Sequence, residues 1–321
     1  MGSFTLTESG INGALAFALE AASAPSWVSA IAGPILSSQQ ETEKYRFSGM
    51  APALRQWVGE RQAKRLAEFA QNTSNVKYET TLEVFSEELK WDKTGQVQQR
   101  INDLAGRAAQ HWASLMTTKM ESTDDAYDDV DFFSDSHLNG DGATVDNNIS
   151  YNVTTTTAPT AAEMEQVILD IIETFMAFTD ETGEPANETL QAITLIVPPK
   201  FVSATAAAIN NPVLSDSNGA RTNIVQSAMG DFRISYAVNP RLTAANDILY
   251  AFRTDNIGMP AMYRQADIPS ESSSDTADVT IQSQGENSDY FFETDKLRFG
   301  LKAYRAVDVG DFRKAIKITL T

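Results

Sequence analysis

The sequence predicts an α+β fold, because helical and strand-like segments occur without the regular alternation that a doubly wound α/β protein requires. Two segments in the middle of the chain have the periodicity of amphipathic helices, and the last third consists mainly of short alternating segments. The chain has 321 residues, of which 42% are hydrophobic and 21% charged, so it has enough apolar material for a sizeable core. We expect one large domain or two closely packed ones, and no internal repeat is visible.

Residues 1–44 are expected to form an arm with short helical patches, since residues 11–22 are apolar and rich in alanine. The first basic residue is Lys44, and Glu20 interrupts the apolar run, so the positively charged start of a secretory signal is missing. No stretch approaches the roughly 20 apolar residues of a membrane helix. We therefore expect neither a secretion signal nor a membrane partner.

Two strands are expected between residues 45 and 90, around 65–71 and 76–86. In the second strand five residues alternate onto one face: Val76, Tyr78, Thr80, Leu82 and Val84. Residues 72–75 have the composition of a turn, which predicts that the two strands form a hairpin. A lone hairpin is marginal in water, so this one should lie on another part of the protein or on a neighbouring subunit.

Residues 92–121 are predicted to form one long helix, with Asp92 or Thr94 capping its first turn. Its apolar and small residues recur in steps of three or four: Val97, Ile101, Leu104, Ala108, Trp112 and Leu115. At about 1.5 Å per residue the helix would be roughly 40 Å long, which is more than a compact globule needs. We expect the other segments to be arranged around it.

The net charge of −18 comes mainly from one part of the chain. The interval between Lys119 and Lys200 contains no Lys or Arg but seventeen Asp and Glu. Nucleic-acid binding depends on Lys and Arg that displace counterions, so no tight nucleic-acid groove is expected there. Five of the acids cluster in residues 124–131, but their spacing does not match the calcium loop of an EF-hand. We favour a structural or solvated role for this cluster over a bound cation.

A second helix is predicted over residues 160–178, because a Thr-x-x-Glu capping box at Thr160 precedes a broad apolar stripe. Residues 193–197 read as a buried strand, and a further helix is expected over residues 199–209. Residues 210–221 are polar and contain glycine, which predicts a long exposed loop.

The last third is predicted to contain strands at residues 232–238, 248–253 and 279–281. Residues 270–278 include five Ser or Thr and three acids, so we expect a solvated connector. Residues 296–320 are expected to form a terminal hairpin.

Residues that carry chemistry are scarce. The chain has no Cys and only two histidines, His111 and His137, so thiolate metal sites are excluded and His-based relays have few candidates. It also lacks a phosphate-binding glycine loop, a G-x-S-x-G elbow and an H-E-x-x-H motif. We expect no catalytic residue, no cofactor and no metal site, and a packing or capping role for His111. The remaining alternative is an acid-rich metal-binding protein or hydrolase that uses residues 124–131.

Several segments carry a resemblance through their order. They are YRFSGMAPALRQWVGER, YETTLEVFSEEL, the long helix, YDDVDFFSDSH, LIVPPKF and LRFGLKAYRAVDVGDF. In this order the chain resembles the Mu-like bacteriophage major head subunit family, the gpT-type major capsid proteins. The resemblance extends from about residue 40 to residue 320, and its most specific pieces are residues 57–61, residues 127–137 and the C-terminal segment.

The resemblance implies the HK97-type phage capsid fold. Its parts, laid on this chain, are an N-terminal arm (1–44), an E-loop (45–90), a P-domain with a long spine helix (91–185), an A-domain (186–268) and a return to the P-domain (269–321). The expected subunit-interface residues are Arg55, Trp57, Glu60, Arg61 and Tyr78.

The function that the resemblance implies is that of a major capsid protein of a tailed bacteriophage or prophage, not an enzyme. Copies of it would assemble into hexamers and pentamers of an icosahedral shell that encloses double-stranded DNA without sequence-specific binding. Assembly would occur in the host bacterial cytoplasm, with portal, scaffold or protease, and decoration proteins as further partners. The acidic excess would keep packaged DNA from adhering to the wall. An encapsulin-like shell of the same fold, which encloses protein cargo, is the alternative.

Overall fold

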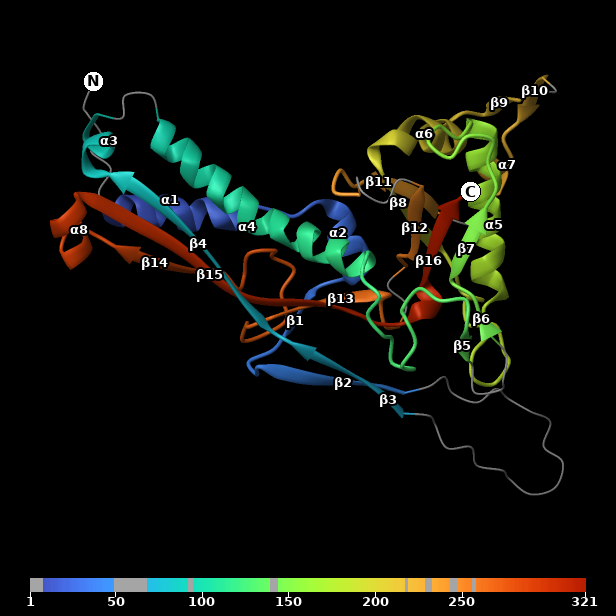
Figure 1. The fold of residues 1–321 in the computed structure, drawn as a ribbon, viewed down its shortest axis with the longest axis horizontal. Helices are drawn as coiled ribbons and strands as arrows, with labels where there is room; N and C mark the ends of the chain where they lie inside the picture. Colours follow the sequence, from blue (N-terminus) through green and yellow to red (C-terminus); the bar gives the residue numbers. More distant parts are fainter. Residues whose placement is uncertain are drawn as a thin grey trace.

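The computed structural model describes residues 8–48, 68–91, 95–138, 144–216, 219–228, 233–242, 247–255 and 258–321. The molecule has two parts (Figure 1): an elongated part in which two helices lie along a long sheet, and a second sheet flanked by its own helices. Helices and strands are mixed without regular βαβ units, which confirms the α+β class.

The long sheet is organised around one strand, β15 (Lys296–Val309), which pairs antiparallel with three others. Its partners are β4 (Val76–Phe85), β14 (Thr280–Gln284) and β13 (Met262–Ala266), and β1 (Ile35–Ser37) runs parallel beside β13. Alternate residues of β15 are buried, as expected of a strand with one face on a core.

Two helices cover the buried face of this sheet, α1 (Glu8–Ala21) and α4 (Gln96–Met120), which pack side by side (Figure 1). Their apolar residues join those of β15 in one core: Ile11, Leu15, Leu19, Val97, Ile101, Ala105, Leu297, Phe299 and Leu301. The long predicted helix is confirmed. Its N-cap is Gly95, in a left-handed conformation with φ of 72°. Asp92 and Thr94, the predicted capping residues, lie outside the described residues, so their capping role stays a prediction.

Three short helices complete the elongated part: α2 (Ser26–Ala32), α3 (Ser86–Trp91) and α8 (Asp289–Thr294). With α1, α2 confirms the helical patches predicted for the first 44 residues. Among the residues described, no single helix is long and apolar enough to cross a membrane, and α1 and α2 meet that test only as a pair bent by 62°.

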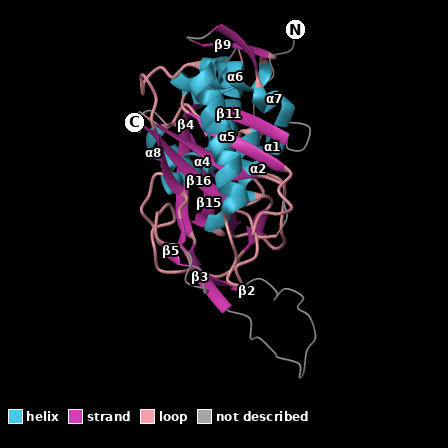
Figure 2. Cartoon of the chain, turned by 90° about the vertical axis from the view of Figure 1, so that its right-hand side faces the viewer, coloured by secondary structure: helices cyan, strands magenta, loops and turns pink. Residues whose placement is uncertain are grey.

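The second sheet has the strand order β11-β8-β12-β16-β7. The bounds are Arg233–Val238 for β11, Ala192–Val197 for β8, Ile248–Arg253 for β12, Ala315–Leu320 for β16 and Asn148–Tyr151 for β7. β8 and β12 are almost wholly buried, since helices cover this sheet (Figure 2). The strands predicted at residues 193–197, 232–238 and 248–253 are therefore confirmed.

The helices of this part are α5 (Ala161–Ala177), α6 (Val202–Asn210) and α7 (Ile224–Ala228), with 3₁₀ turns η1 (Pro199–Phe201) and η2 (Phe312–Lys314). The capping box that begins α5 is confirmed. The Thr160 hydroxyl accepts from the Glu163 N–H at 3.2 Å, and the Glu163 carboxylate accepts from the Thr160 N–H at 2.7 Å. A small pair, β5 (His137–Leu138) and β6 (Thr144–Val145), lies below this sheet (Figure 1).

The strand pairing predicted before the long helix is wrong. β3 (Glu68–Ser74) does not turn back on β4; it pairs with β2 (Thr42–Ser48), while β4 pairs with β15. Asn75 interrupts an otherwise continuous run of strand, so the polar residues read as a turn lie mostly in β3. We call the β2–β3 pair the ribbon.

Two other pairings also differ from prediction. The expected terminal hairpin at residues 296–320 is wrong, because β15 belongs to the long sheet and β16 to the second. The expected loop at residues 210–221 contains an antiparallel pair, β9 (Val213–Asp216) with β10 (Gly219–Thr222). In both cases the correct partner depends on contacts that local sequence pattern does not encode.

The expected solvated connector at residues 270–278 instead neutralises a buried pair of arginines. Asp278 binds Arg305 through two hydrogen bonds of 2.7 and 2.9 Å, and Asp275 pairs with Arg264. Both arginines are almost fully buried beside the ring of Trp112, with the Arg305 guanidinium 4.5 Å from its centroid. This cluster ties α4, the long sheet and the connector together.

Candidate functional site

The two histidines have packing roles in the structure. His111 is half-buried on α4, with its ring edge-on to Tyr78 at 4.4 Å, and burial followed by the Arg305 charge lowers the pKa of His111. His137 is fully buried, its Nδ1 lies 2.7 Å from Asp128 Oδ2, and its ring stacks on Phe312. Within the described ranges no three or more His, Asp or Glu side chains form a group that could hold a metal ion.

The acidic cluster at residues 124–131 supplies partners to neighbouring elements. Asp124 accepts a hydrogen bond from Lys119 at 2.8 Å, and the bonds from Lys119 and Ser122 lower the pKa of Asp124. The Asp128 carboxylate lies against His137, whereas Asp125 and Asp131 form an isolated backbone β-bridge. The carboxylates of Asp124 and Asp128 thus act in the structure as hydrogen-bond acceptors and counter-charges.

Of the five predicted interface residues, the structure describes one. Arg55, Trp57, Glu60 and Arg61 lie outside the described residues, so their interface role stays a prediction. Tyr78 is on β4, half-buried against the ring of its own His111, and a single chain does not test its role between subunits.

The ribbon projects from the body below the long sheet (Figures 1 and 2). Among its side chains that the structure describes, Thr73 alone is buried, at 2% exposure. A two-stranded ribbon is marginal in water on its own, so a projecting one is suited to contact with another chain.

The opposite end of the molecule exposes aromatic side chains on α3, α8 and the end of β4. Trp91 is 70% exposed and Phe292 92%, while Phe85 is about half exposed. We call these three residues the aromatic end. Sequence reasoning missed them because exposure depends on the fold, although each is adjacent to or near acidic residues in sequence, as at EELKW and DYFFET.

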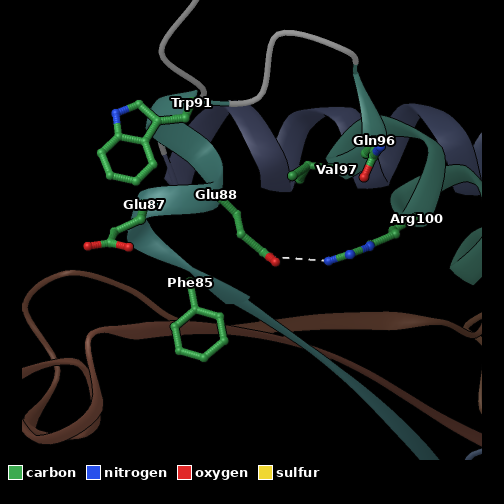
Figure 3. A pocket seen from close by; sticks show the side chains of 7 residues that line it. All are labelled: Phe85, Glu87, Glu88, Trp91, Gln96, Val97 and Arg100. Carbon is green, nitrogen blue, oxygen red and sulfur yellow. Dashed lines mark hydrogen bonds and ion pairs between the residues drawn. The ribbon is translucent and has the colours of Figure 1, made fainter.

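A pocket of about 500 Å³ opens between α3 and the first turn of α4 (Figure 3). Its lining is Phe85, Glu87, Glu88, Trp91, Gln96, Val97 and Arg100. The Glu88 carboxylate accepts from Arg100 at 3.2 Å across the opening, and the Trp91 ring stands outward at its rim (Figure 3). Large exposed apolar groups of this kind, rimmed by charge, mark sites of association.

The charge at the aromatic end is predominantly acidic. Glu87 and Glu88 on α3 and Asp289 and Glu293 on α8 are all exposed. The nearby Glu83 is held by a hydrogen bond from the Tyr290 hydroxyl at 2.6 Å and by bonds from Arg298 and Lys296, which lower the pKa of Glu83 to about 2. An occupant of this surface should therefore be aromatic or aliphatic and basic.

Comparison with known proteins gives one family match. Residues 7–162 match the family described as the Mu-like prophage major head subunit gpT. No curated protein matches the chain.

Solved structures with a similar fold include two phage capsid structures and a virus-like particle. The capsid protein of cyanophage P-SCSP1u is 12% identical with a TM-score of 0.56, and the match covers 94% of this chain and 89% of that one. A virus-like particle from Pyrococcus furiosus is 10% identical with a TM-score of 0.53, covering 97% of this chain and 98% of that one. The procapsid protein of bacteriophage JBD30 is 16% identical with a TM-score of 0.51, covering 97% and 74%. The chain thus has the HK97-type capsid fold.

Proposed function

Because residues 7–162 match the Mu-like prophage major head subunit gpT family, we infer that this chain is the major capsid protein of a tailed bacteriophage or prophage. It is a structural protein rather than an enzyme, and it belongs in the virion capsid. Its function is to associate with copies of itself in a shell. The family match favours a phage head over an encapsulin-like compartment.

The observation that carries self-association is the complementarity between two ends of one chain. Residues 49–67, which connect the two strands of the ribbon, contain four basic residues and one acid together with Leu54, Trp57 and Val58. The aromatic end is apolar and acidic. Opposite charges steer such surfaces together, and buried aromatic side chains supply most of the binding energy.

The available lengths of chain support a contact between copies rather than within one chain. Residues 49–67 leave and return at paired residues of the ribbon, so this loop of nineteen residues extends at most about 35 Å from its base. From that base, β3 with seven residues and β4 with ten run on in nearly the same direction to α3 (Figure 1). At about 3.3 Å per residue the two strands span roughly 55 Å, which exceeds the reach of the loop.

A head-to-tail contact of this kind is heterologous, so it generates rings when the rotation closes. We assign the rings to the hexamers and pentamers of an icosahedral shell. In this assignment residues 1–44 are the N-terminal arm, 45–90 the E-loop, 186–268 the A-domain, and 91–185 with 269–321 the P-domain. The interface residues would then be Arg55, Trp57, Glu60, Arg61 and Tyr78.

The shell would enclose double-stranded DNA without reading its sequence. The acidic interval between Lys119 and Lys200 repels phosphate, so packaged DNA should not adhere to the wall. Assembly would take place in the host bacterial cytoplasm, with portal, scaffold or protease, and decoration proteins as further partners. Retention of DNA by an assembled shell at low salt would contradict this account of the charge.

The experiment is light scattering of the purified full chain, followed by negative-stain imaging. Rings or closed particles are expected, and their formation should weaken as salt screens the charged ends. A chain that stays monomeric at high concentration in the absence of other proteins and in the presence of an added scaffold would refute self-assembly.

A further inference from the structure

One carboxylate, Asp308 near the end of β15, joins the ribbon to α4. Its Oδ2 accepts from the Thr73 hydroxyl at 2.7 Å, and its Oδ1 accepts from the Lys119 ammonium at 2.8 Å and from the Val309 N–H at 2.9 Å. Asp308 is only 5% exposed. A buried carboxylate is stable when it is paired and its oxygens are hydrogen-bonded, and these contacts meet both conditions.

Lys119 supplies the counter-charge from the last turn of α4. Burial opposes its charge, but the carboxylates of Asp308 and Asp124 outweigh burial and raise the pKa of Lys119. The ammonium is therefore charged throughout the neutral range. Asp308 is the more deeply buried of its two partners, since the Asp124 side chain is 54% exposed.

Thr73 is the matching contact on the ribbon. Its hydroxyl donates to Asp308 and accepts from the Tyr263 hydroxyl at 2.6 Å, so a chain of hydrogen bonds runs from β13 through the ribbon to α4. Hydrogen bonds linked in this way strengthen one another in a low-dielectric interior. The ring of Tyr45 on β2 packs edge-on against Tyr263 at 5.0 Å, so the second strand of the ribbon also contacts β13.

Other contacts hold the chain at Asn75, the residue between β3 and β4. The Asn75 amide donates to Ser38 Oγ and to the Gln40 carbonyl, both at 3.1 Å, and accepts from Gln265 at 3.0 Å. These bonds fix where the ribbon starts. They do not reach α4, whereas the Thr73–Asp308–Lys119 chain does.

We propose that Asp308 is the positioning residue that fixes the direction of the ribbon relative to α4. Among the described residues of the ribbon, the contacts with the body come from its half next to Asn75, through Tyr45, Gln71 and Thr73. A rotation at Thr73 therefore displaces the opposite end of the ribbon. A neighbouring copy can bind the ribbon only if that end points in the required direction. This inference rests on the proposed function in one respect, that the ribbon contacts another copy; its effect on the ribbon itself can be measured in the isolated subunit.

The test compares three variants of the full chain by hydrogen exchange and by particle imaging. Asp308→Asn removes the charge at nearly constant shape. Thr73→Val removes the Thr73 hydroxyl, and with it both the bond to Asp308 and the bond from Tyr263, while the longer bond from Gln71 to Asp308 remains. Asp124→Asn is the matched control, because it also removes a carboxylate from Lys119 but does not touch the ribbon. Exchange is measured on the amides of residues 42–46 and 70–74, with the amides of α4 as the internal reference.

We expect exchange in the ribbon to rise about tenfold or more in Asp308→Asn and in Thr73→Val, with little change in Asp124→Asn. Particles of the first two variants should be fewer or irregular, while their subunits stay folded. Ribbon exchange equal to that of the control in both variants would overturn the proposal. If Asp308→Asn does not fold, Thr73→Val decides. If the unmodified chain forms no particles, the proposed function fails, but the exchange measurement still tests the positioning role.

Discussion

Removal of the buried Asp278 carboxylate should destabilise the subunit far more than removal of an exposed carboxylate. Asp278→Asn keeps the shape of the side chain and removes the charge that faces Arg305. Arg305 would then remain 1% exposed, with hydrogen bonds to the carbonyls of Ala108 and Asp275 but without its own counter-ion. An arginine cannot give up its proton at neutral pH, so the unpaired charge stays buried.

The magnitude follows from this burial. Removing one partner of a buried pair costs about 3–5 kcal/mol, and the bidentate geometry with 2.7 and 2.9 Å bonds places this pair in that range. At roughly 2 °C per kcal/mol for a chain of this size, the melting temperature should fall by about 6–10 °C. Thermal or urea unfolding of dissociated subunits can be followed by tryptophan fluorescence, to which Trp112, whose ring contacts the arginine, contributes.

Glu88→Gln is the control for this prediction. It removes a carboxylate that also pairs with an arginine, Arg100, but both side chains are more than 40% exposed. An exposed pair contributes at most about 1 kcal/mol, so the melting temperature should change little. A loss below about 1 kcal/mol for Asp278→Asn, equal to that of the control, would refute the assignment of the buried pair as a stabilising lock.

Three further predictions concern assembly and acid stability. Trp57→Ala and Arg61→Ala should each lower particle yield at least about tenfold, by sedimentation, with melting of the subunit unchanged; normal yields in both would remove the assignment of residues 49–67 to an interface. Trp91→Ala should likewise reduce particle yield while costing under about 0.5 kcal/mol in subunit stability, whereas Phe17→Ala, which removes a 74% exposed ring on α1, should do neither, and equal yields for the two would count against the aromatic end. Burial raises the pKa of Glu163, but hydrogen bonds from Thr160 and Thr154 outweigh it and lower the pKa to about 2, so the stability that Glu163 adds is complete above about 4.5 and is lost as pH falls toward 2. Glu163→Gln should flatten acid unfolding in that window, and an unchanged acid transition by circular dichroism would show that the capping carboxylate contributes nothing.

Local features of the fold could be predicted from the sequence. The box at Thr160 and the apolar stripe after it define α5, because capping and helical periodicity involve residues within a few positions of one another. The alternation from Val76 onward defines β4 for the same reason. The family resemblance and the capsid fold are also confirmed.

Pairings between distant residues could not be predicted. Nothing in the polar residues 72–75 shows that β3 pairs with β2, since the chain crosses from one partner to another at Asn75. Asp278 looks solvated in a Ser-rich stretch, and only the fold brings Arg305 to it. The exposure of Trp91 and Phe292 could not be predicted either, because residue type alone does not distinguish an exposed apolar side chain from a buried one.

The position of β15 and β16 in the chain has a consequence for biosynthesis. Every strand that either one pairs with precedes it in sequence, so the centre of the long sheet and an inner strand of the second sheet leave the ribosome after their neighbours. Contacts of such long sequence separation form late and slowly. A nascent chain therefore lacks the central strand of the long sheet until translation passes residue 309, and it lacks an inner strand of the second sheet until translation passes residue 320.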